Sequence, residues 1–478
     1  MQTGKRKPTI VMAGATGFVG TELRRALRGD YHLVCLTRSR AGLKSASGED
    51  GEEWRRCDLF SLLELEHALE GADYAIYLVH SMMPSARLIQ GTFADLDLIM
   101  ADNFARAARQ AGLKQIIYLG GLIPAMEELS SHLASRLEVE EALGSGGTPV
   151  TALRASLIVG PGGSSLRIVV NLVKRLPVMI LPGWTRTRTQ PIAIEDVVRA
   201  FQTVLGKPAF YGRHFDIGGP DQMTYQEMLS RTAKALGRKR IFLNVPFFSA
   251  RLSKLWVTML GGASRYLVGP LVDSLRHPMV ASPNALQSII EDGSIPFDDA
   301  LKASINQQGI TVPNPRDHIR KEDDHSIRKA RRVRSVQRMN LPEGMTAEGI
   351  LKEYFRWLPG VLFPFLRGSV REGGIWQLGL IFQKWRLIEF TLSRDRSSSG
   401  RQLLYITGGL LARLQKTPEG NRRARIEFRE MLDRRCLIVA IHDFTPMLPW
   451  FIYSRTQARF HLWVMRRFGN HLRRIKAR

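Results

Sequence analysis

The chain has few cysteines and no long hydrophobic run. Only three cysteines occur in 478 residues, namely Cys35, Cys57 and Cys436, and their positions give no paired spacing of the kind that binds metals. A disulfide framework and a metal site are therefore not expected, and a reducing compartment suits the chain. No stretch reaches the roughly 18 apolar residues of a transmembrane helix, and no apolar signal segment precedes the first expected strand. These absences predict a cytoplasmic protein.

Acidic residues are also in short supply. The chain has 69 Lys and Arg against 44 Asp and Glu, a net charge of +25, and residues 340–478 alone hold 25 basic and 11 acidic residues. Such a positive field favours anionic partners, whether lipid headgroups, nucleic acid or an acidic protein. No nucleic-acid-binding module is recognisable, so no specific nucleic acid is predicted as a partner. Peripheral contact with an anionic membrane through the basic C-terminal region is the preferred interpretation of the charge.

Residues 9–20 combine an apolar run with Gly14, Gly17 and Gly20, and a helical pattern follows. Strand, glycine turn and helix form the setting of a dinucleotide-binding fingerprint, although an ordinary turn that carries glycines is the alternative. The three glycines would allow a sharp turn, backbone approach to a phosphate and close packing of helix on strand. The other loop residues expected at the pyrophosphate are Thr16, Phe18 and Val19.

Strand and helix patterns alternate through the first half of the chain. Strands are expected at 31–37, 54–57, 74–79, 115–119, 150–153 and from 215, helices at 62–70 and 96–111, and a helix-opening capping box at 224–227. This rhythm predicts an α/β fold for residues 1–314, a doubly wound parallel Rossmann-type sheet with a small substrate lobe. A nucleotide should then bind at the carboxyl edge of the strands.

The second half has a different pattern. Residues 315–339 are polar and mixed in charge, which predicts an exposed basic linker. Strands are expected beyond it at 375–380, 385–392, 402–406, 423–428 and 436–442, followed by one basic and aromatic helix at 449–475. This order predicts an antiparallel α+β domain over residues 340–478. The aromatic side chains of its helix could line a cavity, enter a membrane interface or, most commonly, pack on the sheet.

Five stretches carry a resemblance to a known family. They are Gly-Ala-Thr-Gly-Phe-Val-Gly at 14–20, Cys-Asp-Leu at 57–59, Tyr-Leu-Val-His-Ser-Met at 77–82, Pro-Ile-Ala-Ile-Glu-Asp-Val at 191–197 and Phe-Asp-Ile-Gly-Gly-Pro at 215–220. Residues 8–310 thereby resemble the atypical extended short-chain dehydrogenase/reductases, the branch with NmrA-like proteins and the nucleotide-binding subunit of respiratory complex I. Residues 340–478 more faintly resemble a helix-grip (START-like) domain, a fold with an apolar cavity.

The end of the second strand distinguishes between the two nicotinamide cofactors. An acid there would hold a ribose 2′-hydroxyl, whereas a basic residue suits a 2′-phosphate. The strand ends Thr37-Arg38-Ser39-Arg40 without an acid, which predicts NADP(H) bound by Arg38 and then by Arg40 or Lys44. Solvated loop charge is the alternative for the last two, and the better one for Lys44. The resemblance places Asp58 and Leu59 beside the adenine and Leu78, Val79, Leu119 and Gly120 on the floor of the site.

The catalytic residues of this family are missing from the chain. Its Tyr-x-x-x-Lys pair is replaced by His132 and Arg136 at the same spacing, and Gly120-Gly121 stand where a hydroxyl residue is expected. A histidine could serve as general acid near neutral pH, and the arginine could hold ribose hydroxyls. The alternative, an exposed helix histidine beside a degraded hydride-transfer site, has equal weight.

A second basic pair, Arg186 and Arg188, precedes residues 191–194, a region that faces the substrate cleft in the extended fold. If extended, the two side chains would point the same way and could bind a phosphate or carboxylate, solvated loop charge being the alternative. Two functions are compatible with these patterns. The first is an NADP(H)-dependent oxidoreductase acting on a small apolar carbonyl or quinone substrate, and the second is a non-catalytic NADPH sensor or assembly factor.

Overall fold

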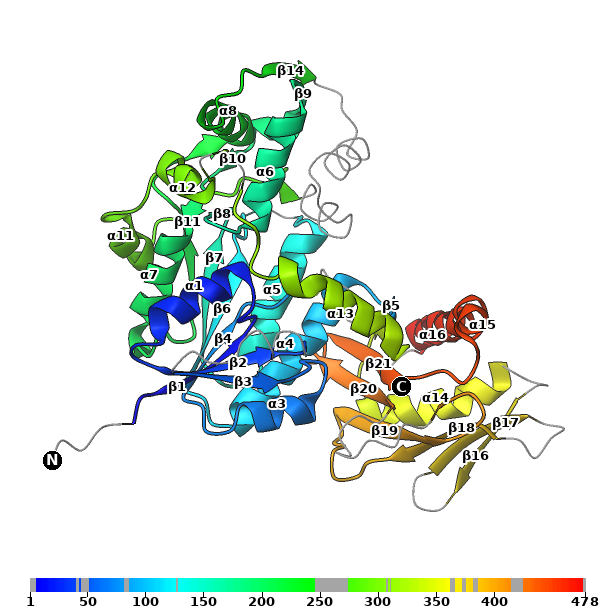
Figure 1. Ribbon diagram of the computed structural model, residues 1–478. Helices are drawn as coiled ribbons and strands as arrows, with labels where there is room; N and C mark the ends of the chain where they lie inside the picture. The colour runs from blue at the N-terminus through cyan, green and yellow to red at the C-terminus, as the bar shows by residue number, and fades with distance from the viewer. Residues whose placement is uncertain are drawn as a thin grey trace. The chain divides into compact units, whose positions relative to one another are not determined.

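The protein forms two compact units, which are drawn together in Figure 1. Unit 1 comprises Met1–Met83 and Ala101–Asp323, and unit 2 comprises Pro84–Met100 and Asp324–Arg478. The computed structural model describes residues 6–39, 43, 51–80, 86–125, 128–245, 274–306, 308–309, 311–361, 366–371, 375–380, 386–413 and 424–475. None of the helices in these ranges is long and apolar enough to cross a membrane.

Unit 1 is built on a seven-stranded parallel sheet, which confirms the predicted Rossmann-type fold. The strand order is β12-β7-β6-β4-β1-β2-β3. The strands are β1 (Thr9–Ala13), β2 (His32–Thr37), β3 (Glu52–Arg56), β4 (Tyr74–Tyr77), β6 (Gln115–Gly121), β7 (Val150–Ala155) and β12 (His214–Ile217). All of β1 is buried, as expected for a parallel strand covered on both faces. Because the chain runs outward to β3 and then returns to β4 on the other side of β1, the order reverses between β1 and β4, where a ligand crevice belongs.

Helices cover this sheet, and a smaller lobe follows it (Figure 1). The helices of the main layer are α1 (Phe18–Leu27), α3 (Leu62–Ala68), α4 (Phe93–Gln110, which crosses the unit boundary), α5 (Ser131–Gly144) and α7 (Ile194–Val204). The lobe contains α6 (Ser164–Arg175), α8 (Tyr225–Ala235), α12 (Phe297–Ser304) and the strand pairs β8 (Ile158–Val159) with β11 (Ile192–Ala193), β9 (Val178–Pro182) with β14 (Ile241–Val245) and β10 (Arg188–Thr189) with β13 (Met223–Thr224). Two further elements are the short helix η1 (Gly183–Arg186) and α11 (Ala285–Glu291). The predicted capping box is confirmed, since Thr224 and Glu227 cap each other at the start of α8.

The segment expected to be an exposed linker is instead largely ordered as α13 (Asp317–Ala330) and β15 (Val333–Met339). Val333 and Val336 are buried, and Arg334 on the same strand is only 3% exposed. The prediction of an exposed linker is wrong because the arginines of this segment suggested solvent exposure, whereas Arg334 is buried within a strand of the sheet.

Unit 2 contains an eight-stranded sheet in the order β16-β17-β18-β19-β20-β21-β15-β5. The remaining strands are β16 (Leu366–Arg371), β17 (Ile375–Leu380), β18 (Arg386–Leu392), β19 (Arg401–Gly408), β20 (Arg425–Met431), β21 (Cys436–Phe444) and β5 (Leu88–Gln90). Neighbouring strands are antiparallel except for β15 and β5, which are parallel. The predicted antiparallel α+β domain is thus confirmed, with an added edge strand from the segment between β4 and α4.

The single helix expected at 449–475 is two helices, α15 (Trp450–Arg455) and α16 (Gln457–Arg474). The chain breaks between them at Thr456, which has φ −116° and ψ −85°, outside the helical region. The apolar periodicity continues across this residue, and for that reason the break could not be read from the hydrophobic pattern.

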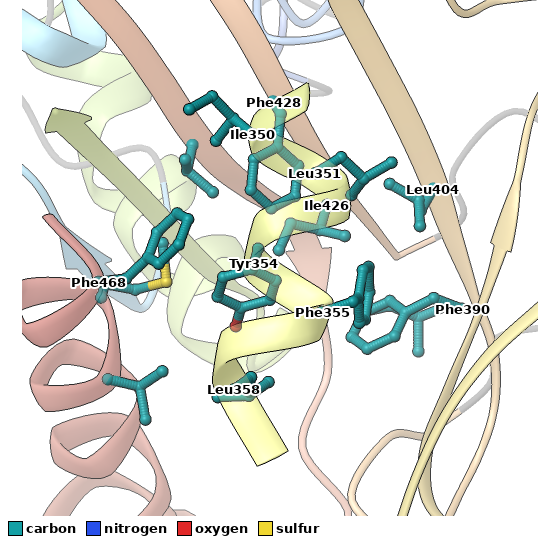
Figure 2. Packing of buried hydrophobic residues seen from close by; sticks show 14 of the residues in the cluster. Ile350, Leu351, Tyr354, Phe355, Leu358, Phe390, Leu404, Ile426, Phe428 and Phe468 are labelled. Atoms are coloured by element: carbon teal, nitrogen blue, oxygen red, sulfur yellow. The ribbon is translucent and has the colours of Figure 1, made fainter. Parts of the chain in front are cut away.

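Aromatic side chains fill the space between the sheet of unit 2 and its helices α14 (Ala347–Val361) and α16 (Figure 2). The Tyr354 ring lies 5.4 Å from Phe428 and 5.0 Å from Phe468, centroid to centroid. Phe355 stacks on Trp376 at 4.2 Å. The helix-grip resemblance of this unit, with the apolar cavity that it implies, stays a prediction.

The strands of unit 2 carry buried charges on alternate residues. On β20, Ile426 and Phe428 belong to the aromatic core, whereas Glu427 and Arg429 alternate with them. Glu427 Oε1 accepts hydrogen bonds from Arg401 Nε at 2.5 Å and Arg429 Nε at 2.8 Å. Although burial raises the pKa of Glu427, the charges of Arg401 and Arg429 lower it more, well below its usual range. The carboxylate therefore stays ionised.

His442 of β21 is fully buried beside this carboxylate, with its Nε2 3.7 Å from Glu427 Oε2. Burial and then the positive charge of Arg425 lower the pKa of His442 to about 3. The imidazole is therefore neutral in the folded protein, whereas in the unfolded chain it takes up a proton below its ordinary pKa of about 6.5.

We predict that the free energy of unfolding falls as the pH is lowered from about 6.5 towards 5, because the unfolded chain then binds more protons at His442 than the folded protein does. The contribution of one such histidine reaches about 1.4 kcal/mol per pH unit. Chemical denaturation at pH 7, 6 and 5 should show a shallower slope for His442→Asn. The exposed His325→Asn serves as control and should keep the wild-type slope, and equal slopes in all three proteins would contradict the prediction.

Candidate functional site

The glycine turn after β1 brings α1 against the strand. Gly14 has φ +95°, which favours glycine, and a Cβ there would lie 3.0 Å from Leu78 Cβ. A Cβ on Gly20 would collide with Gly14 O and lie 2.9 Å from Ala15 Cα. Gly17 is the N-cap of α1 and offers no side chain to its N–H groups. The helix therefore begins with uncapped donors at the crevice, as an anion site requires.

The apolar residues predicted around the nucleotide lie where β1, β4 and β6 end. Val19, Leu78 and Leu119 are partly buried against the core of unit 1. The Phe18 ring has a packing role, since Cβ atoms on Gly160 and Gly163 would come within 2.8 and 3.4 Å of it. Thr16 and Val79 are half-buried beside them. These positions agree with a hydrophobic floor, and the contacts of the individual residues with a nucleotide remain predictions.

The end of β2 supplies polar groups. Arg38 is half-buried and directly precedes the buried Ser39, whose N–H donates to Thr37 Oγ1 at 3.2 Å. The Ser39 hydroxyl donates to the Asp323 carboxylate of α13. Arg40 and Lys44 lie outside the described residues. Neither Ser39 nor Asp323 was expected at the site. The only sequence signal for Ser39 was its position as a polar residue next to Arg38, and no local signal pointed to Asp323.

Asp58 and Leu59, expected beside the adenine, shape the turn before α3. Asp58 Oδ1 accepts a hydrogen bond from the Phe60 N–H at 3.2 Å, and Leu59 O accepts one from Asn103 Nδ2 at 2.9 Å. Both residues are half-buried. Their side chains or backbone atoms can still face a nucleotide, but part of their hydrogen-bonding capacity is used by the fold.

The carboxyl end of β6 has no hydroxyl for a carbonyl substrate. A Cβ on Gly120 would lie 2.9 Å from the Tyr118 ring, whose hydroxyl donates to Arg136 O at 3.2 Å. Across this strand end, a Cβ on Gly121 would lie 3.9 Å from Arg136 Cγ. Only Gly120 is therefore sterically required, because of Tyr118, whereas a side chain at Gly121 would make an ordinary contact with Arg136 of α5, which is 7% exposed.

Two histidines and Arg136 gather at this edge. Burial and the charge of Arg136 lower the pKa of His132 to about 4. His80, just after β4, is exposed to solvent, and nearby protein atoms, followed by the charges of Arg136, His132 and Arg316, lower its pKa. Both imidazoles are therefore neutral at pH 7, and a neutral His132 N–H can still donate a hydrogen bond. The role of His132 as general acid stays a prediction. His80 was quoted within a family motif but not recognised as a neighbour of His132.

Arg186 and Arg188 line one open depression of about 530 Å³ in the lobe, together with Arg276. Both are exposed, at the end of η1 and the start of β10, so the segment between them is not uniformly extended. On the neighbouring stretch of chain, Met279 packs with Leu122 and Leu133 beside the β6 end. Three guanidinium groups at one depression suit an anionic group, and Arg276, distant in sequence, was not expected there.

The described residues contain no cluster of three or more His, Cys, Asp or Glu side chains that could hold a metal ion.

Comparison with known proteins gives a match over part of this domain. Residues 10–218, less than half of the chain, match the model of the NAD dependent epimerase/dehydratase family. The Rossmann domain is thus similar to that family over this stretch. The match covers β1 to β12, and thus the glycine turn, the β2 end and the β6 end.

Three known proteins illustrate the similarity. The chain is 32% identical over 146 residues to Auxiliary protein GraX of Staphylococcus aureus (strain NCTC 8325 / PS 47), which covers 30% of this chain and 43% of that protein. It is 25% identical over 237 residues to Ceramide reductase of Caulobacter vibrioides (strain NA1000 / CB15N), which covers 50% and 73%. The solved structure of Citrobacter sp. triphenylmethane reductase complexed with NADP(H) aligns at 19% identity and a TM-score of 0.49, over 62% and 99%. The chain thus spans less than half the length of the first of these relatives.

We predict that Gly20→Ala destabilises unit 1 by about 1–3 kcal/mol, because the added methyl group must push α1 away from β1. Denaturant unfolding measures this change. Gly29→Ala is the matched control, since a Cβ at Gly29 would meet nothing within 4 Å and should change stability by less than about 0.5 kcal/mol. Equal stability of the two variants would show that α1 does not depend on this close approach.

Proposed function

We propose that the protein is an NADP(H)-dependent oxidoreductase whose Rossmann domain binds the cofactor. The observation that carries this proposal is the uncapped start of α1 at Gly17, next to a β2 strand that ends in Arg38 and Ser39. The helix N-terminus suits the pyrophosphate, and a guanidinium followed by a hydroxyl suits an adenosine 2′-phosphate. The residues present thus fit NADP(H).

The reaction proposed is hydride transfer from NADPH to an apolar carbonyl, enone or quinone. Because His132 is neutral and the Tyr-Lys pair is absent, the acceptor must gain its proton from water or from a weak N–H donor, which favours quinones and enones over simple ketones. The similarity to a protein named ceramide reductase supports an apolar substrate. An anionic substituent would bind at Arg186, Arg188 and Arg276. A non-catalytic NADPH sensor is the alternative, and binding without turnover would favour it.

We predict that Arg38→Asp weakens NADPH binding at least tenfold, with little loss of NADH affinity, because the new carboxylate repels a 2′-phosphate and accepts a ribose hydroxyl. Calorimetric titration with both cofactors measures this, and oxidation of NADPH by a quinone panel measures turnover. Arg28→Asp, at the C-cap of α1, is the charge-matched control. Equal losses for NADPH and NADH would remove Arg38 from the phosphate site, and no affinity of the wild type for either cofactor would refute the proposed function.

A second proposed role is peripheral contact of unit 2 with anionic membranes. Phe451, Phe460 and Trp463 of α15 and α16 are exposed, at 62%, 48% and 40%. Phe460 stacks on Trp463 with centroids 5.6 Å apart, and Arg467 lies 4.9 Å above the Trp463 ring. The arginines exposed on the same helices include Arg455, Arg459 and Arg466. Aromatic rings between arginines suit the interface of a bilayer with negatively charged headgroups.

We predict that the protein sediments with phosphatidylserine vesicles and not with phosphatidylcholine vesicles, and that Phe460→Ala/Trp463→Ala lowers the bound fraction several-fold because it removes the inserted rings. Raising the salt from about 0.1 M to 1 M should also release the protein, since exposed charges are then screened. Leu410→Ala, an equally exposed apolar position (53%) outside these helices, is the control. Equal binding of the double variant and the control would contradict the role.

A further inference from the structure

Residues 313–323, here called the strap, follow the lobe and reach the end of β2 within unit 1. At one end, Asn314 Nδ2 donates to Gly162 O at 2.8 Å, and Asp317 Oδ2 pairs with Arg167 Nη1 at 2.5 Å. At the other end, Asp323 accepts the hydroxyl of Ser39, just beyond β2. The strap therefore connects the β8–α6 turn with the end of β2.

The far end of the strap lies beside the strand that neighbours β1. β2 is next to β1 in the sheet, and Asp323 accepts the hydroxyl of Ser39 just beyond the end of β2. Arg316 is near His80, which follows β4, because its charge contributes to the low pKa of that histidine. Arg316 Nη2 also lies 3.9 Å from Asp323 Oδ2. Arg316 thus brings a positive charge close to the Asp323 carboxylate.

The Asp323 carboxylate is incompletely paired. Its side chain is only 13% exposed. Oδ1 accepts the Ser39 hydroxyl, whereas Oδ2 is buried and accepts no hydrogen bond from the described part of the chain. Because the nearest cation, Arg316 Nη2, is 3.9 Å from Oδ2, the carboxylate depends on the Ser39 hydroxyl for its hydrogen bonding in this position.

We propose that Asp323 occupies the place of the adenosine 2′-phosphate, so that NADP(H) must displace this carboxylate from Ser39. This inference rests on the proposed function, because it concerns the cofactor site of unit 1. A carboxylate and a phosphate repel each other strongly in a partly buried site and compete for the same donors. NAD(H) carries a neutral hydroxyl at this position and has no such competition. Asp323 therefore reduces the preference for NADP(H) that Arg38 provides.

The test compares Asp323→Asn with wild type by calorimetric titration of NADPH, NADH, 2′,5′-ADP and 5′-ADP. The amide keeps the size of the side chain and removes its charge, so we expect affinities for NADPH and 2′,5′-ADP to rise about tenfold. Affinities for NADH and 5′-ADP should change less than twofold. Glu322→Gln is the matched control, since this exposed neighbour loses the same charge outside the site and should bind all four compounds as wild type does.

Two outcomes would overturn the inference. Unchanged or weaker binding of NADPH and 2′,5′-ADP to Asp323→Asn would show that the carboxylate does not occupy the phosphate site. A selective loss of NADH affinity would show that Asp323 instead holds a ribose hydroxyl. Failure of the proposed function is distinguishable from both, because wild type and both variants would then bind neither NADPH nor NADH.

Discussion

The close approach of α1 to β1 at Gly20 is the constraint on which the nucleotide site depends. A single methyl group there would collide with the backbone of Gly14, and the turn would no longer place the helix start above the strand end. The same helix is held from the opposite side, where Phe18 packs against the backbone of Gly160 and Gly163. Because both sides of α1 are fixed by glycine contacts, its uncapped N–H groups are preorganised to receive an anion.

In unit 2, the alternation of side chains along a strand separates apolar residues from buried charged residues within one sheet. Ile426 and Phe428 join the aromatic core, whereas Glu427 and Arg429 between them form a buried ion cluster (Figure 2 shows the aromatic residues). Such a cluster is stable only when every member keeps its partner, since the loss of one leaves a buried charge unpaired. Its contribution is therefore specificity of packing and register more than net stability.

Local patterns predicted most of what is local. The glycine turn, the strands of the unit 1 sheet, five strands of the unit 2 sheet and the capping box at Thr224 follow from residues adjacent in sequence, and the structure places them within a few residues of the expected bounds. Strands β5, β15 and β16 of unit 2 were not expected. The misses depend on distant partners. Arg334 is an exposed linker residue by composition but is buried in a strand, and Arg276 joins Arg186 and Arg188 only through the folding of the lobe. For His132, burial and then the charge of Arg136 lower the pKa, and its role as proton donor stays a prediction.

The cofactor rule for Rossmann domains rests on the residue at the end of the second strand, on the assumption that this residue alone meets the adenosine ribose. Here the strand end is basic, but an acid reaches it from 284 residues further along the chain, through Asp323 on Ser39. The carboxylate disfavours a 2′-phosphate and the guanidinium favours it. The preference between NADP(H) and NAD(H) therefore depends on how strongly the carboxylate is bound at this site. Ser39 and Arg316 hold the Asp323 carboxylate, and the proposed preference for NADP(H) therefore depends on whether a 2′-phosphate beside Arg38 displaces it.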